Sequence, residues 1–566
     1  MSTPIARWDV VPYQRFSTSF KIGIVAFHKN GIANIDFTIT GQGFSGSNQS
    51  VSSMLLNDRT GIWEYWISLS PDDFATSGLI SIDATVTGGD SDSRIMDTLY
   101  LNVDKGDLER HEAWVDPTNG SDSTGAIDDN THPFATARIA LQAINTVQGS
   151  VDGAIIYFEE GVHSNGWYNP VTSTEWLTYK PSLNADPSNI SWSSWGGTAT
   201  TTLLKLEGLT IASSGSGNLP FNNTASNIWF DNVTSIGSGQ TVTSSNPLMN
   251  NVVVPTYYTD TIIDNVDYGV YNGTLARNVN VTNSGNDAFV NTLCILDSTA
   301  IGLDPGETTY WHADCYQCHT TPADNRIVFG FYCRDAHYQG IFLRGVGTHQ
   351  NNAFVNCFIE KQGPFRLPTE GATYDTGNNG FDIYGLWDHL LVWHCTLPNS
   401  DFSFYEETEQ GASIINSSWV GNLFTQFIDA HGGINNYENP SWALPGNVNG
   451  NIFEHNHYIY SAVDNGSGTV EGQPYIYSKN PDTDPSGSYS VGDPLIDSNS
   501  ESSTYGYPQS GSPLISRVSP PVVPIDIFGV EWGSSADIGA IKNNIIVTLN
   551  KRSRIRDSIF WRLRRI

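Results

Sequence analysis

Basic residues are scarce in this sequence. Lys and Arg together number 27 against 58 Asp and Glu, which gives a formal net charge of −31 over 566 residues. Such a surface would repel phosphates, so the charge argues against nucleic acid as a partner. It also makes an anionic glycan a poor ligand unless local basic residues or a cation intervene, and calcium is the one cofactor that this leaves open.

Cysteine is scarce as well. Six cysteines are too few for a disulfide scaffold in so long a chain. Five of them recur at intervals that suggest an inward-facing stack of small side chains: Cys294, Cys315, Cys333, Cys357 and Cys395. We therefore expect all six to be unpaired and most to be buried. Cys315 and Cys318 form a CxxC beside His312, but no second CxxC or HxxxH follows, so we predict no metal site.

Long helical periodicity and long apolar runs are nearly absent. Charged residues make up only 15% of the chain and aromatic residues 12%, with 53 glycines, a composition typical of a β-rich protein with many turns. No run is long and apolar enough to span a membrane. Residues 1–16 contain no secretory signal. We therefore expect that an export signal has been removed or that the protein leaves its cell by another route, such as inside a virus particle.

Residues 1–104 have the pattern of a separate β-sandwich domain. Alternating apolar runs occur at 32–40, 62–69, 79–86 and 99–104. Turn-forming residues separate these runs, as in a small antiparallel sandwich. The unit resembles an immunoglobulin-like or fibronectin-like module. We expect Trp63, Tyr65 and Trp66 to be core and cross-strand residues rather than a platform for sugars.

Residues 105–541 form a succession of short strands with irregular loops. The segment 114–144 contains WVDP, a glycine-containing loop, PFAT and an amphipathic stretch, and it resembles the start of right-handed parallel β-helix proteins of the pectate-lyase-like superfamily. ADIGAI at 536–541 resembles the closing signature of that superfamily. The resemblance implies a right-handed parallel β-helix with a capping helix near 134–147. It implies no particular reaction, because this fold carries lyases, hydrolases, epimerases and phage tailspikes.

Two shorter segments, WHADCYQ and WDHLLVWH, are similar to uncharacterised β-helix sequences from environmental bacteria. The chain departs from better-known members of the superfamily, because it contains neither the Asp-rich calcium set of the pectate lyases nor the G-D-D of the polygalacturonases. Catalytic residues of those enzymes therefore cannot be transferred to this chain.

The most polar stretch of the solenoid is 309–366. His312 and Asp314 form an H-x-D pair, and Asp335 and His337 form the reversed pair one interval later. Residues two apart on a strand share a face, and successive coils lie about 4.8 Å apart. We therefore predict that the two pairs stack into one catalytic cluster on the outer face, with Lys361 at its end.

Four further residues are predicted to bind the substrate of this cluster: Arg344, Glu360, Arg366 and Trp387. The longer interval that follows implies an insertion at 367–385, which is rich in glycine. We expect this insertion to overhang the same face and to enclose a groove.

Two chemistries suit this cluster. β-Elimination from a uronate needs a base, for which His337 is suited, and a cation that neutralises the sugar carboxylate, which Arg344, Lys361 or Arg366 would supply. Hydrolysis needs two carboxyl groups, which the acids of the cluster would supply: Asp314, Asp335 and Glu360. The alternative without catalysis is that these side chains only satisfy backbone groups in the turns.

The last segment, 542–566, differs from the rest because it is basic. Its last 16 positions hold seven of the chain's 27 basic residues, interleaved with apolar ones. A helix from 553 onward would be amphipathic and suited to a membrane surface or an acidic partner. The alternative is a tail that covers the acidic body of the solenoid.

Together these patterns predict an extracellular protein that recognises a polysaccharide and is deployed as a tailspike or fibre of a virus particle, with cleavage of the glycan left open. Such virion proteins are commonly trimers, so a homotrimer is the expected assembly. The alternatives are a secreted bacterial polysaccharide lyase or glycoside hydrolase, and a structural or adhesive β-helix without catalysis.

Overall fold

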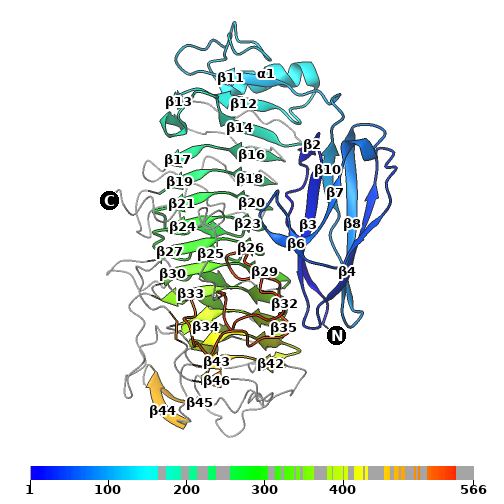
Figure 1. Ribbon diagram of the computed structural model, residues 1–566. Helices are drawn as coiled ribbons and strands as arrows, with labels where there is room; N and C mark the ends of the chain where they lie inside the picture. Colours follow the sequence, from blue (N-terminus) through cyan, green and yellow to red (C-terminus); the bar gives the residue numbers. More distant parts are fainter. Residues whose placement is uncertain are drawn as a thin grey trace.

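The computed structural model contains a β-sandwich packed alongside a parallel β-helix (Figure 1), which confirms the predicted fold class. The structure describes residues 2–163, 174–192, 203–212, 227–237, 255–303, 313–319, 324–336, 339–344, 348–361, 379–384, 386–398, 401–405, 413–424, 427–430, 452–458, 465–470, 473–478, 490–491, 495–496 and 507–542. The predicted basic tail lies outside these residues from position 543 onward. Among the described residues, no helix has the length and apolar character needed to cross a membrane.

The sandwich consists of two facing sheets. One sheet has the order β1 (Ile5–Trp8), β3 (Phe20–Phe27), β7 (Trp63–Leu69) and β6 (Leu55–Leu56). The other has the order β2 (Arg15–Phe16), β10 (Leu99–Val103), β8 (Gly78–Gly88), β4 (Ile32–Thr40) and β5 (Gln49–Val51), with β9 (Ser93–Ile95) beside β8. In β4, Ile35, Phe37 and Ile39 are buried between exposed neighbours, so alternation in the sequence places one face of the strand in the core.

The β-helix begins with β11 (Glu112–Val115) and is capped by α1 (Ala137–Gln148), near the predicted position. The Thr136 hydroxyl accepts a hydrogen bond from the Ile139 N–H at the start of α1, and Gly149 ends the helix with a φ of 80°. Ala140, Leu141 and Ile144 are fully buried on one face of α1. The helix therefore covers the open end of the core, as a solenoid requires.

Three parallel sheets form the walls of the solenoid. The long sheet contains β11, β12 (Ile155–Phe158), β14 (Leu177–Pro181), β16 (Leu204–Glu207), β18 (Ile228–Asp231), β20 (Thr256–Thr259), β23 (Leu275–Arg277), β26 (Cys294–Leu296), β29 (Arg326–Phe329), β32 (Thr348–Val355), β35 (Leu386–Trp393), β39 (Ser418–Val420) and β42 (Ile452–Glu454), with β38 (Ser413–Ile415) beside β35.

The middle sheet contains β17 (Thr210–Ala212), β19 (Thr234–Ile236), β21 (Ile262–Asp264), β24 (Asn280–Thr282), β27 (Thr299–Leu303), β30 (Tyr332–Ala336), β33 (Phe358–Lys361), β36 (Thr396–Leu397), β40 (Leu423–Phe424), β43 (His457–Tyr458) and β46 (Ser490–Val491). The short sheet contains β22 (Val270–Tyr271), β25 (Phe289–Val290), β28 (Tyr316–Cys318), β31 (Ile341–Leu343), β34 (Asn379–Tyr384), β37 (Asp401–Tyr405) and β41 (Phe427–Ala430). Two small pairs lie outside these walls: β13 (Gly161–His163) with β15 (Ile190–Trp192), and β44 (Asn465–Val470) with β45 (Gln473–Ser478).

Left-handed residues mark the turn from the long sheet to the middle sheet. They recur in successive coils with φ between 50° and 70° in all but one case: Asn232, Asp260, Asn278, Asp297 (43°), Gly330, Asn356, His394, Gly421 and His455. Asn, Asp, His and Gly tolerate this conformation better than other residues do. The residue types that follow each strand in the sequence are therefore those that the tight turn requires.

Two of the cysteines form a disulfide. Cys315, just before β28, is bonded to Cys333 in β30, with 6.1 Å between the two Cα atoms. The prediction that all six cysteines are unpaired is therefore wrong, because adjacent coils bring these two side chains together inside the core. Cys294, Cys318, Cys357 and Cys395 are free and buried, as expected for an inward-facing stack.

The sandwich packs against the outer face of the long sheet through a continuous apolar interface. Sandwich residues such as Val25, Phe27 and Ile62 join long-sheet residues such as Trp229 and Trp393 in one buried cluster. Phe27 lies edge-on to Trp393, with ring centroids 6.2 Å apart. Residues from the described C-terminal stretch 507–542 belong to the same cluster, so the sandwich is a packed partner of the solenoid rather than a tethered module.

The sandwich interior agrees with the expectation for its aromatic residues. Tyr65 is 8% exposed in the sandwich core, and Lys21 lies over the Trp66 ring, 4.0 Å from its centroid.

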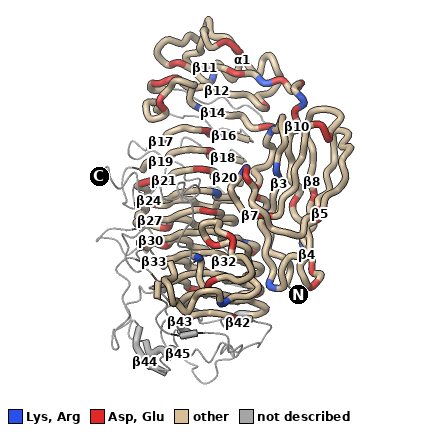
Figure 2. Tube along the Cα trace, in the orientation of Figure 1, with Lys and Arg blue, Asp and Glu red and all other residues tan. Residues whose placement is uncertain are grey.

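Acidic residues are spread over both bodies, the sandwich and the solenoid, whereas basic residues are few (Figure 2). The few basic residues at the contact between the sandwich and the solenoid therefore indicate where buried acids are paired.

Buried charges lie at this contact. Asp9 of the sandwich is fully buried, and its Oδ1 lies 2.7 Å from Nη1 of Arg277 in β23. Arg59 also donates to the Asp9 carbonyl oxygen at 3.3 Å. The carboxyl of Glu64 accepts a hydrogen bond from Asn57 Nδ2 at 2.6 Å. Gly23 faces Glu64 across the sheet, and a Cβ at this position would overlap the Glu64 carboxyl, so only glycine fits there.

Candidate functional site

The structure separates the two pairs that the sequence placed in one stack. Asp314 precedes β28 of the short sheet, whereas Asp335 lies in β30 of the middle sheet. Their side chains therefore belong to different walls of the solenoid, and the predicted stacking of the H-x-D pair on the D-x-H pair is wrong. His312 and His337 lie outside the described residues.

Asp335 and Glu360 do lie together on the middle sheet. Nε of Arg334 lies 3.2 Å from Oε2 of Glu360 and 4.0 Å from Oδ2 of Asp335. The register between β30 and β33 shifts here, and Asp335 has a φ of 58°, so β30 carries a bulge at this point. Glu360 is 4% exposed and paired with Arg334, an arrangement that neutralises its charge and suits a structural ion pair.

The remaining predicted residues are dispersed. Arg344 is exposed directly after β31 of the short sheet. Lys361 is the last residue of β33, but its side chain is not among those described, and Arg366 lies outside the described residues. Trp387 in β35 is 1% exposed, and its ring stacks on His349 with 4.5 Å between the centroids. The prediction that Trp387 contacts substrate is corrected, because the packed core leaves no ring face for a sugar.

The predicted insertion at 367–385 is shorter than expected. Residues 379–384 form β34, which pairs in parallel with β31 and β37, so this part belongs to the wall of the solenoid. Residues 362–378 lie outside the described residues. The overhanging groove therefore stays a prediction.

The short sheet carries a column of polar residues. Its inward row is apolar and lies in the core: Val270, Phe289, Tyr316, Ile341 and Phe381. Asp287, Asp314 and Gln339 stand two positions before three of these residues, at equivalent places in successive coils. All three are at most 4% exposed. Asp267 lies beside the column, three positions before Val270 and so one position out of this register, with 8% exposure.

Hydrogen bonds join this column from coil to coil. The Asp314 N–H donates to Asp287 Oδ1 at 3.0 Å, and the Gln339 N–H donates to Asp314 Oδ1 at 3.0 Å. Nε2 of Gln339 donates to Oδ2 of Asp382, which lies in β34. Asp314 therefore does satisfy turn backbone, as the non-catalytic alternative expected, but it does so within a row of further acids.

Burial is the main cause of raised pKa values among these acids. Burial, and then the charge of Asp314, raises the pKa of Asp287 well above its ordinary value. Burial raises the pKa of Asp267 to about 6. Burial and the charges of Asp287 and Asp267 raise the pKa of Tyr268 to about 12. Asp267 and Asp287 therefore keep their protons to a higher pH than ordinary aspartates do.

Two buried polar atoms have no hydrogen-bond partner among the residues that the structure describes: Oδ1 of Asp267 beside the column and Oε1 of Gln339 in it. Buried polar groups are usually satisfied, so these two atoms point to a partner from solution. Tyr268 and Tyr271 are half-buried at the same end of the sheet as Asp267, edge-on to each other with 6.1 Å between ring centroids. Asp267, at 8% exposure, is the least buried of the three acids Asp267, Asp287 and Asp314.

Possible metal ligands are dispersed among the described residues. Within the described ranges, no three His, Cys, Asp or Glu side chains are arranged to hold a metal ion. The CxxC cannot act as a ligand pair, because Cys315 is bonded to Cys333. Calcium binding stays a prediction.

Comparisons with known proteins assign no family. No family model matches the chain, and no curated protein matches it. A family 28 exopolygalacturonase from Yersinia enterocolitica aligns with 81% of this chain and 86% of its own, at 11% identity and a TM-score of 0.19. A polysaccharide deacetylase from Bacillus cereus aligns with 46% of this chain and 96% of its own, at 9% identity and a TM-score of 0.14. Such scores carry no functional argument, so function is argued from the site.

Proposed function

We propose that this chain binds an extracellular polysaccharide along the short sheet and hydrolyses it with Asp267, Asp287 and Asp314. The observation that supports the proposal most is the row of buried acids in which the pKa values of Asp267 and Asp287 are raised. Glycoside hydrolysis needs one carboxylic acid that holds its proton near neutral pH and one carboxylate that assists water. Proximity and burial supply both states here.

The roles follow from position. Asp267 is the least buried of the three acids, at 8% exposure, and with a pKa of about 6 it is suited to protonate the leaving sugar oxygen. We assign the role of base to the Asp287–Asp314 pair, which would accept the proton of the water that attacks the sugar carbon. The glycosidic bond breaks, one hydroxyl forms on each fragment, and solvent returns the protons to their starting groups.

Aromatic side chains beside the acids suit a sugar ligand. Tyr268 and Tyr271 present half-buried rings next to Asp267, and such rings pack against the apolar faces of sugar rings. We place the sugar unit that is cleaved at these two tyrosines. With its pKa raised to about 12, Tyr268 stays protonated at neutral pH and can donate a hydrogen bond to the glycan.

The test is incubation with alginate, pectin, ulvan and neutral marine glycans, read by new reducing ends and by absorbance of unsaturated ends. We expect reducing ends without unsaturated ends. Asp267→Asn should lower the rate by about 10²–10⁴-fold, the usual contribution of a general acid. Asp335→Asn is the matched control, because Asp335 lies on the middle sheet and its side chain is 46% exposed, and its rate should equal that of the wild type.

Three outcomes would count against the proposal. Unsaturated ends would show β-elimination, the chemistry expected of a lyase. Unchanged rates in Asp267→Asn and Asp287→Asn would remove the column from catalysis. Absence of binding to every glycan would favour a structural or adhesive module.

Deployment as the tailspike or fibre of a virus particle is the finer form of this proposal. It is supported by the sandwich, which packs along the long sheet and shares a buried apolar cluster with the solenoid. We expect a homotrimer by light scattering. A monomer would favour the secreted enzyme, and contact of the basic tail with a virion or membrane surface stays a prediction.

A further inference from the structure

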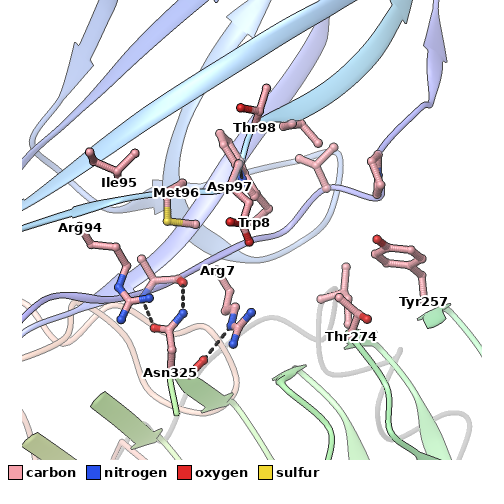
Figure 3. A pocket seen from close by; sticks show the side chains of 15 residues that line it. Arg7, Trp8, Arg94, Ile95, Met96, Asp97, Thr98, Tyr257, Thr274 and Asn325 are labelled. Carbon is pink, nitrogen blue, oxygen red and sulfur yellow. Dashed lines mark hydrogen bonds between the residues drawn. The ribbon is translucent and has the colours of Figure 1, made fainter. Parts of the chain in front are cut away.

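A pocket lies between the sandwich and the β-helix, on the long-sheet side of the solenoid (Figure 3). Its volume is about 210 Å³. The sandwich contributes Arg7, Trp8 and Arg94 to its wall, and the β-helix contributes Tyr257, Thr274 and Asn325. The pocket therefore exists only when the two bodies are packed together.

Asn325 fixes the two walls to each other. Its Oδ1 accepts a hydrogen bond from the Ala6 N–H at 3.1 Å, and its Nδ2 donates to the Ala6 carbonyl at 3.0 Å. The residue has a φ of 54°, a conformation that Asn tolerates better than most residues. The pocket is thus preorganised, because β1 cannot shift relative to β29 without breaking both hydrogen bonds.

Two guanidinium groups reach this pocket, and each uses only one of its hydrogen-bond donors among the described residues. Arg7 donates from Nε to the Asn325 carbonyl at 2.7 Å, and Arg94 donates from Nε to the Pro4 carbonyl at 2.6 Å. Among the residues that the structure describes, neither side chain forms an ion pair within 4.0 Å, and the terminal Nη atoms have no hydrogen-bond acceptor. Figure 3 shows both side chains directed toward Asn325.

The lining of the pocket contains two guanidinium groups and one carboxyl group, that of Asp97. Burial lowers the pKa of Arg7, and the neighbouring charges of Arg94 and Arg326 lower it further, against the opposing effects of Cys294 and Asp97. Burial also lowers the pKa of Arg94, against the opposing charges of Asp324 and Asp97. An anion in this pocket would relieve the repulsion between the guanidinium groups. Such a site is unusual in a chain with a formal charge of −31.

We propose that this pocket binds one uronic acid unit, with its carboxylate on Arg7 and Arg94 and its ring against Trp8 and Tyr257. Guanidinium groups bind carboxylates with paired, charge-assisted hydrogen bonds. Aromatic side chains pack against the apolar face of a sugar ring. Pockets for drug-sized ligands measure roughly 300–1,000 Å³, so the smaller cavity here suits one sugar unit. The inference is independent of hydrolysis at the short sheet.

The ligand has two sources with the same chemistry, a free sugar acid or the terminal unit of an acidic glycan. Either would bridge the sandwich and the solenoid. Because only the folded, docked protein has the pocket, binding should raise the melting temperature as well as release or absorb heat.

Calorimetric titration of the full chain with galacturonate, glucuronate, galactose and sulfate tests the proposal. We expect binding of the uronates and none of galactose. Arg94→Gln should weaken uronate binding roughly ten- to hundredfold, the usual worth of a hydrogen-bonded charge. Arg138→Gln is the matched control, because Arg138 is exposed on α1, and it should bind as the wild type does.

Arg94→Lys keeps the charge but loses the planar fork, so its affinity should fall between those of the wild type and Arg94→Gln. If circular dichroism shows that Arg94→Gln does not fold, the uronate affinity of Arg94→Lys still tests the role of Arg94. Equal affinity for galactose, equal affinity for sulfate, or unchanged uronate binding in both Arg94 variants would each overturn the proposal. Tighter binding of an acidic tetrasaccharide than of the monomer would support it with the chain end as ligand, and equal binding would support it with the free sugar acid.

Discussion

Two groups of buried acids in this molecule have different hydrogen-bond and ion-pair partners. At the contact between the sandwich and the long sheet, Asp9 is held by Arg277 and Glu64 by Asn57. In the column on the short sheet, Asp287 receives only the backbone N–H of Asp314, and neither Asp267 nor Asp287 forms an ion pair with any described residue. Burial alone therefore does not mark a functional acid.

The difference lies in the counter-charge. A buried carboxylate is costly unless a partner stabilises its charge. The interface provides arginines from both bodies, as expected of groups that hold two domains together. The column instead sets carboxyl beside carboxyl, which destabilises the charged forms and keeps protons bound near neutral pH. That property serves proton transfer and does nothing for domain contact.

The largest change in the free energy of unfolding should follow from removal of the Arg277 charge at the interface between the sandwich and the solenoid. Arg277→Met keeps most of the apolar stem and leaves Asp9, which is fully buried, without its ion-pair partner. Loss of one member of a buried pair costs about 3–5 kcal/mol. We expect a decrease of that size in the free energy of unfolding, measured with urea at pH 7.

The double variant Arg277→Met with Asp9→Asn is the control for this experiment. It removes both charges, so it should recover much of the lost free energy of unfolding. A decrease below about 1 kcal/mol in the single variant would mean that the interface does not depend on its ion pair, and the contrast with the short sheet would fail.

The next effect tests the column. The pKa of folded Asp267 is raised from 3.8 to about 6, so between these pH values the folded state holds a proton that the unfolded state has released. The stability associated with that proton is present below the unfolded pKa and is lost as pH rises through the folded pKa. We expect Asp267→Asn to raise the free energy of unfolding at pH 7 by about 2 kcal/mol relative to the wild type, which is less than the full shift would give because solvent screens the partly exposed carboxyl.

The same variant should differ little from the wild type at pH 4, where folded Asp267 is protonated. Urea unfolding across pH 4–8 measures both values. A constant difference between variant and wild type over that range would show that proton binding by Asp267 is not perturbed, and the column would then resemble an ordinary set of turn-capping acids.

The sequence was informative about the architecture and less so about the site. The β-helix, the preceding sandwich and the α1 cap were predictable, because alternation, turn residues and the opening motif are local signals. Asp314 was predicted as a site residue, but its partners were assigned by sequence interval. Loops of different length separate the coils, so Asp287 and Gln339 share its position whereas Asp335 belongs to another sheet.

A more useful signal was present in the strands themselves. A polar residue, a small residue and an inward apolar residue recur in order at DAF (287–289), DCY (314–316), QGI (339–341) and NGF (379–381). Aligning the coils on that pattern would have found the column. The Asp9–Arg277 pair could not be found this way, because its members are 268 residues apart and meet only when two independent units pack together.

The smallest change in the free energy of unfolding should come from substitution of Glu64. This acid lies at the interface, but its pKa is raised as are those of Asp267 and Asp287 at the short sheet. Burial, and then the charge of Asp9, raises the pKa of Glu64 well above its ordinary value, in spite of the hydrogen bond from Asn57 and the nearby guanidinium groups. Folded Glu64 therefore keeps its proton to a higher pH than an ordinary glutamate does. Glu64→Gln preserves the shape of the side chain and the acceptor for Asn57, so we expect the free energy of unfolding at pH 5 to change by less than about 1 kcal/mol.

The raised pKa of Glu64 determines how the difference in stability between Glu64→Gln and the wild type changes with pH. Because the folded pKa of Glu64 is raised, wild-type stability declines as pH rises above the unfolded value, and a glutamine has no such decline. The variant should thus become more stable than the wild type toward pH 8, as followed by urea unfolding. If Glu64→Gln instead cost several kcal/mol at every pH, Glu64 would be a charged partner of Arg59 and Arg277, and the interface would hold both of its acids ionised while the column holds its acids protonated.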